Sequence, residues 1–156
     1  MIELTSHSVA ETLSIGRAIA RHASSGDIVC LTGGLGSGKT VLTKGICAGL
    51  GVDKDEVISP TFVLLRQYDG RLPLYHFDLY RLRTPEDIVN IGYEEYVYGA
   101  GVSVIEWADR MGSLTPKEFL KVDLSVRNRT QRRLAFTAHG SRFRTLLGKI
   151  HEDTMR

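Results

Sequence analysis

An eight-residue, glycine-rich stretch carries residue types that can surround a phosphate group. Residues 33–40 read GGLGSGKT and match the pattern G-x-x-x-x-G-K-[ST]. Glycines allow a tight turn in which successive N–H groups point at anionic oxygens, and a following helix adds its positive dipole end. Lys39 can reach terminal phosphates, and the Thr40 hydroxyl can bind Mg²⁺. The predicted nucleoside triphosphate site comprises Gly33, Gly34, Leu35, Gly36, Ser37, Gly38, Lys39, Thr40 and Val41.

Two acidic residues each end an apolar run further along the chain. Glu106 follows residues 102–105, and Asp78 follows residues 74–77. Phosphoryl transfer depends mostly on positioning and charge neutralisation, so it needs a carboxylate near Mg²⁺ and a group that orients the attacking water. We predict that Glu106 is the acid on the metal side and that Asp78 is the second acid. The alternative is that each is a surface acid at the end of a strand.

Two further residues are candidates on weaker grounds. Trp107, the only tryptophan, adjoins Glu106, and it is either a packing residue or a residue beside the nucleotide. Thr61 lies in an extended segment next to Pro60, and it is either an ordinary loop residue or a switch threonine that reaches Mg²⁺. The chain has no Asn/Thr-Lys-x-Asp segment of the kind that reads guanine, which favours ATP over GTP.

The loop requires a strand before it and a helix after it, and the sequence supplies both. Residues 27–32 are the predicted strand, with an apolar run from Ile28, and a helix-compatible run extends from Lys39 to about Gly49. The other predicted elements are a helix at 8–23 with Ser8 as its N-cap, a hairpin of 62–68 and 72–79, a helix opening at Thr84, a buried strand at 102–105, a hairpin of 119–126 and 133–138, and a short helix after Ser141. This order predicts the α/β class: residues 1–156 form one P-loop NTPase-like domain, whose central, mostly parallel sheet has antiparallel additions and is flanked by helices.

Composition excludes several classes of protein. The 156 residues are 42% hydrophobic and 24% charged, which is ordinary for a globular domain. No apolar stretch approaches the ~20 residues of a membrane span, and the N-terminus lacks the features of a signal peptide. Neither Cys30 nor Cys47 has the spacing of metal ligands, and both are expected in the core. We therefore predict a cytoplasmic protein without a membrane contact.

The positive charge is concentrated late in the chain. Residues 124–150 contain Arg127, Arg129, Arg132, Arg133, Arg142, Arg144 and Lys149 and no acidic residue, although the whole chain has a net charge of only +2. Such a stretch can meet RNA, an acidic protein or the phosphates of the nucleotide, or it can be a solvated surface.

Taken together, these motifs resemble the TsaE family, small P-loop ATPases of bacterial tRNA threonylcarbamoyladenosine synthesis. The matching segments cover about residues 5–140. They are residues 31–40, Ser59-Pro60-Thr61-Phe62, residues 74–82 (LYHFDLYRL), residues 92–96 (GYEEY) and Ile105-Glu106-Trp107. The loop is shared by many families, whereas the second and third segments together are specific to this one.

The resemblance implies a role for each candidate. Lys39 and the loop would hold ATP, Thr40 and Glu106 would bind Mg²⁺, and Asp78 would lie at the hydrolytic centre. Thr61 would belong to a switch that responds to the nucleotide, and Trp107 would lie near the nucleotide. An arginine before the last strand, Arg132 or Arg133, would approach it, and we take Arg133 as the candidate. One departure is Gly34, because the family usually carries aspartate there.

The resemblance also implies partners. The ATPase would bind the complex of the TsaD and TsaB proteins, which transfers the threonylcarbamoyl group to tRNA, and its ATP cycle would support repeated turnover. We therefore expect weak hydrolysis by the protein alone and a contact with these proteins or with tRNA through residues 124–150. The alternatives are a small-molecule P-loop kinase and a nucleotide sensor whose hydrolysis has no role.

Overall fold

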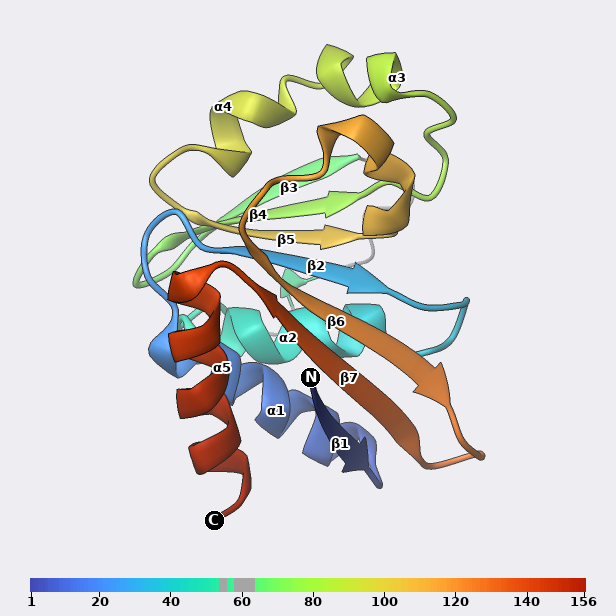
Figure 1. The fold of residues 1–156 in the computed structure, drawn as a ribbon, viewed down its shortest axis with the longest axis vertical. Coiled ribbons are helices and arrows are strands. Elements are labelled where there is room, and N and C mark those ends of the chain that lie inside the picture. Colours follow the sequence, from blue (N-terminus) through green and yellow to red (C-terminus); the bar gives the residue numbers. More distant parts are fainter. Residues whose placement is uncertain (54–55, 58–63) are drawn as a thin grey trace.

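The computed structural model describes residues 1–53, 56–57 and 64–156. Their strands form one sheet in the order β1-β7-β6-β2-β5-β4-β3 (Figure 1). The strands are β1 (Ile2–Ser6), β2 (Ile28–Thr32), β3 (Leu65–Asp69), β4 (Pro73–Asp78), β5 (Val102–Glu106), β6 (Phe119–Val126) and β7 (Arg132–His139). Strands β6, β2, β5 and β4 run parallel, and β3, β7 and β1 are each antiparallel to their neighbours. The predicted fold class is confirmed.

Helices cover both faces of the sheet. They are α1 (Val9–His22), α2 (Lys39–Gly49), α3 (Pro85–Asn90), α4 (Tyr93–Val97), α5 (Ser141–Thr154) and the 3₁₀ helix η2 (Ala108–Leu114). Figure 1 shows α1, α2 and α5 on one side of the sheet and α3 and α4 on the other. Because side chains alternate along a strand, β5 sends Val104 into the core with α1 and α2, and Ile105 into the core with α3 and α4.

Helix α2 is held tightly against α1, which fixes the end of the loop. A Cβ on Gly45 would lie 2.4 Å from the Leu13 carbonyl oxygen, so only glycine permits this approach. Leu42 and Ile46 of the same helix are fully buried. The two cysteines are buried as predicted, and burial raises the pKa of each thiol to about 12.

The capping predictions are confirmed at two helices. The Ser8 side chain accepts a hydrogen bond from the backbone N–H of Glu11 at the start of α1. Thr84 and Asp87 form a reciprocal capping box at the start of α3, with Pro85 in the first turn. No helix of the described residues is both long and apolar enough to cross a bilayer.

Several elements differ from the sequence-based predictions. Strand β1 was not expected, because only Ile2 and Leu4 mark it, and it depends on pairing with β7, where Ile2 lies opposite Phe136. Helix α5 has 14 residues and is therefore not short. Strand β3 begins at Leu65, and the predicted strand start at 62–63 lies outside the described residues.

Candidate nucleotide-binding site

The loop between β2 and α2 is packed against the neighbouring strand β6. Gly33 has a φ of 139°, and a Cβ there would lie 2.3 Å from the Leu124 carbonyl oxygen. Glycine is therefore required at this position, both by the backbone conformation and by the close contact. Gly34, in contrast, has nothing within 4 Å of where its Cβ would lie. The departure from the family pattern at Gly34 thus leaves the packing of the loop unchanged.

Lys39 points back into the loop. Its Nζ donates to the carbonyl oxygens of Gly33 at 2.7 Å and Gly34 at 2.8 Å, and it lies 4.1 Å from the centre of the Trp107 ring. Burial lowers the pKa of Lys39, and the nearby carboxylates of Glu106 and Asp78 act in the opposite direction. The ammonium group is thus held inside the loop, close to two acids.

The two predicted acids lie side by side at the carboxyl edge of the sheet. Asp78 and Glu106 are paired residues at the ends of the parallel strands β4 and β5. Thr40 donates from Oγ1 to Oε1 of Glu106 at 3.1 Å. Asp78 accepts a hydrogen bond of 3.0 Å from the backbone N–H of Tyr80. The loop threonine and both carboxylates therefore meet at one place, as the sequence predicted.

Electrostatics distinguish Asp78 within this group. Burial raises the pKa of Asp78, and the neighbouring Glu106 carboxylate raises it further. The Tyr80 N–H, His76 and Lys39 each lower it. Competing influences of this kind are typical of side chains at functional sites.

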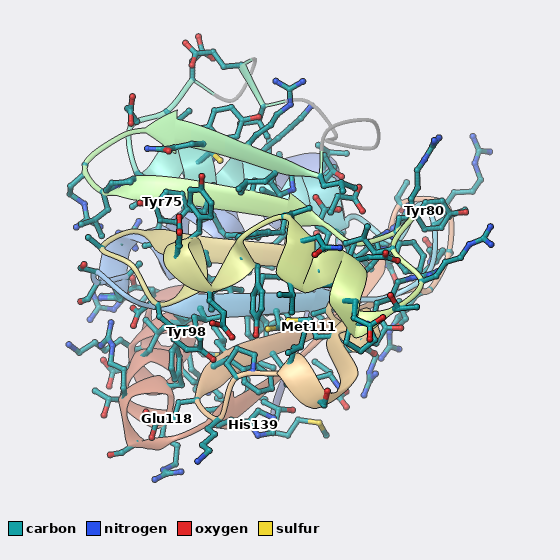
Figure 2. All side chains as sticks on the ribbon, turned by 90° about the horizontal axis from the view of Figure 1, so that it is seen from above. Tyr75, Tyr80, Tyr98, Met111, Glu118 and His139 are labelled. Atoms are coloured by element: carbon teal, nitrogen blue, oxygen red, sulfur yellow. The ribbon has the colours of Figure 1, made fainter. Side chains whose placement is uncertain are left out.

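Trp107 turns the chain from β5 into η2. Its φ of 59° makes it the one non-glycine residue with positive φ among those described. The ring packs at 4.9 Å from the ring of Tyr80, and Arg110 lies 5.8 Å from the tryptophan ring. Figure 2 shows Tyr80 at the end of the sheet toward which the parallel strands run. Trp107 is therefore adjacent to the loop lysine.

These groups open into one cavity of about 540 Å³, which lies in the size range of ligand pockets. Five segments line it. They supply His7, Ser8, Val9 and Thr12; Leu35, Gly36, Ser37, Gly38, Lys39, Thr40 and Val41; Asp78 and Tyr80; Glu106 and Trp107; and Arg129, Thr130 and Arg132. Gly33 and Gly34 shape the loop without lining the cavity. Thr61 lies outside the described residues.

The choice of Arg133 is corrected by the direction of its side chain. Arg133 forms an ion pair with Glu3 of the edge strand β1. Arg132 lines the cavity instead, with Nη2 3.4 Å from the Gly36 carbonyl oxygen. Neighbouring residues of a strand point to opposite faces, so the two arginines cannot share one site.

Residues 124–150 do not form a single basic face. Arg129 and Arg132 reach the cavity, whereas Arg142 donates to the buried Asp27 carboxylate, with Nε 3.1 Å from Oδ1. Figure 1 shows the turn between β6 and β7 and the start of α5 at opposite ends of the molecule. Arg142 therefore supports the fold, while the turn faces the site.

Sequence reasoning missed the wall formed by His7, Ser8, Val9 and Thr12, together with Arg129 and Thr130. Ser8 was recognised only as a helix cap. These residues lie far from the loop in sequence and share no spacing with it. The one available signal was the basic stretch that contains Arg129.

The donor set fits Mg²⁺ only together with phosphate. Among the described residues, no group of three His, Cys, Asp or Glu side chains could hold a metal ion. Thr40, Glu106 and Asp78 offer oxygen atoms, which are the ligands that Mg²⁺ prefers, and Mg²⁺ commonly combines one or two carboxylates with substrate phosphates. The glycine-rich loop, which the sequence predicts to bind phosphate, lines the same cavity.

Comparison with known proteins gives consistent matches. A family model described as "Threonylcarbamoyl adenosine biosynthesis protein TsaE" matches residues 6–134. A Treponema pallidum protein named tRNA threonylcarbamoyladenosine biosynthesis protein TsaE is 46% identical over 121 residues, covering 78% of this chain and 89% of the relative. A Bacillus subtilis protein of the same name is 40% identical over 141 residues, covering 90% and 87%. The crystal structure of B. subtilis YdiB matches with a TM-score of 0.83 at 33% identity, covering 97% of this chain and 95% of that one.

Proposed function

The chain belongs to the TsaE family and takes part in tRNA threonylcarbamoyladenosine biosynthesis, and from this premise we propose that it is a Mg²⁺-dependent ATPase of that machinery. The observation that supports the ATPase most strongly is the meeting of three groups in one cavity. The loop lysine Lys39, the Thr40–Glu106 hydrogen bond and the Asp78 carboxylate all line it.

Each residue then has a task. Lys39 exchanges its bonds with the Gly33 and Gly34 carbonyl oxygens for bonds with phosphate oxygens. Thr40 and Glu106 hold Mg²⁺, which neutralises charge on the phosphates when bound. Asp78 orients the water that attacks the terminal phosphorus, and Arg132 adds positive charge beside the loop.

We further propose that the protein acts with the TsaD and TsaB proteins in the cytoplasm, and that its ATP cycle supports their repeated turnover. Family membership supports this proposal through the shared pathway. Hydrolysis by the protein alone is expected to be slow, because the family resemblance implies an ATP cycle that these partners modulate.

Trp107 offers the first test of nucleotide binding. It is the only tryptophan, and it lies between Lys39 and Tyr80. Titration with ATP in Mg²⁺ is expected to change its fluorescence saturably, and GTP is expected to do so at higher concentration. Repeating the titration with the TsaB–TsaD complex present tests whether the loop binds ATP only in the presence of its partners. No response to ATP under either condition would contradict the proposal.

The turn between β6 and β7 is the part of the basic stretch that we propose meets the TsaB–TsaD complex. Arg127 is exposed in this turn, close to the cavity-lining Arg129. Arg127→Glu is expected to weaken association about tenfold, chiefly through the association rate and more at low salt, while ATP binding stays unchanged. Surface plasmon resonance at two salt concentrations measures both effects.

Arg144→Glu is the matched control for this reversal. Arg144 is also exposed, but it lies in the first turns of α5, at the other end of the molecule. The variant is expected to associate as the wild type does. Equal weakening by both variants would mean that overall charge, and not the turn, governs association.

A further inference from the structure

One buried histidine contacts the carboxylate that we place at the metal. His76 lies in β4 and is fully buried. Its Nε2 hydrogen-bonds to Oε2 of Glu106, and Thr40 Oγ1 donates to Oε1 of the same carboxylate. His76 and Asp78 point to the same face of β4, because two positions separate them along the strand. The function proposed above gives His76 no task.

We propose that His76 is a positioning residue that fixes the Glu106 carboxylate for Mg²⁺. The proposal rests on the function proposed above. Among the described residues, Thr40 and His76 are the side chains that hydrogen-bond to Glu106. Thr40 is itself a proposed metal ligand, so the metal competes with Glu106 for the Thr40 hydroxyl. The metal does not compete for His76, which is the other hydrogen-bond partner of Glu106. Residues that orient a metal ligand in this way typically change metal affinity or activity 10–100-fold when they are replaced.

The other nitrogen of the ring supports this assignment. His76 Nδ1 is buried and has no hydrogen-bond partner among the described residues. An ionised carboxylate only accepts hydrogen bonds, so Nε2 is the donor in this contact. A residue that merely filled the core would avoid this cost, since an apolar side chain would leave no buried polar atom unpaired. Within the described part of the chain, Glu106 is therefore the hydrogen-bond partner of the ring.

Two amide substitutions separate positioning from simple loss of the histidine. In His76→Gln the side-chain amide nitrogen reaches about as far as Nε2, so it can donate to Glu106. In His76→Asn the amide nitrogen corresponds to Nδ1 and falls short of Glu106. Both variants bury a neutral amide in the same strand, so their structural costs are similar. Ser103→Ala is the control for disturbing a buried polar atom on the opposite face of β5.

The first measurement is metal affinity and not turnover. Mn²⁺, which shares the ligand preference of Mg²⁺, is titrated into protein saturated with a non-hydrolysable ATP analogue, and free Mn²⁺ is read by electron paramagnetic resonance. His76→Asn is expected to weaken Mn²⁺ binding about 10–100-fold, and His76→Gln less than about threefold. Binding of the analogue in the presence of a chelator is expected to stay unchanged in both. Equal losses in the two variants, or an unchanged Mn²⁺ affinity in His76→Asn, would overturn the proposal.

A second measurement needs neither nucleotide nor metal. Long-range ¹H–¹⁵N correlation spectra of the wild type are expected to show His76 with its proton on Nε2, and Glu106→Gln is expected to shift that signal. A ring without a proton on Nε2, or no shift, would overturn the proposal whatever the protein binds. A wild type that binds neither analogue nor Mn²⁺ would instead overturn the proposed function, so the two failures are distinguishable.

Discussion

Replacing Lys39 by alanine is expected to weaken ATP binding about 10²–10⁴-fold, since hydrogen bonds to charged groups contribute about 1.5–3 kcal/mol each and the lysine offers at least two to phosphate. Nζ already makes two bonds of 2.7 and 2.8 Å, to the carbonyl oxygens of Gly33 and Gly34. It also lies close to the Glu106 and Asp78 carboxylates, so its loss leaves their negative charge facing the phosphates.

Isothermal titration calorimetry is the appropriate measurement for this variant. Lys39 lies over the Trp107 ring, and its removal changes the fluorescence before any ligand is added. Lys44→Ala is the matched control, because Lys44 belongs to the same helix and does not line the cavity. An affinity for ATP within about threefold of the wild type would show that the loop does not hold the phosphates through this lysine.

Asp78→Asn is expected to leave ATP binding intact and to slow hydrolysis about 10²–10⁴-fold, the usual contribution of a positioned acid or base. Asparagine keeps the shape of the side chain and an oxygen that can accept from the Tyr80 N–H. It loses the negative charge that orients a water molecule for attack. Release of phosphate in a single turnover, with the TsaB–TsaD complex present, measures the effect.

Asp109→Asn controls for the loss of one negative charge near Lys39, because Asp109 lies close enough to influence that lysine but does not line the cavity. Unchanged phosphate release in Asp78→Asn would remove Asp78 from the hydrolytic centre. Transfer of the terminal phosphate to a metabolite would favour a kinase. Full cellular function of the variant would favour a sensor whose bound state alone matters.

The centre of the site could be predicted from the sequence because local patterns encode it. The loop motif fixes Lys39 and Thr40 within a few residues of each other. Asp78 and Glu106 each follow an apolar run, and the ends of neighbouring parallel strands meet at one edge of the sheet. The strand assignments therefore sufficed to place both acids at one edge of the sheet, whereas the fold shows that their two strands are neighbours.

The rim of the site could not be predicted in the same way. Choosing between Arg132 and Arg133 requires the register of β7, because a shift by one residue would move each side chain to the other face of the sheet. The wall at residues 7–12 depends on β1, a strand that only Ile2 and Leu4 mark in the sequence. The contact between His76 and Glu106 joins two strands whose pairing is known only from the fold.

The pairing of the first strand with the last also affects how the protein is synthesised. Ile2 of β1 cannot pair with β7 until Phe136 has left the ribosome. Residues 7–12 directly follow β1, so their position also depends on this pairing. Contacts between distant parts of a chain form late, because a long loop must be closed first. A nascent chain can thus display the phosphate loop and both acids while the far wall of the pocket is still missing. The complete pocket therefore forms only after residue 136 has been translated.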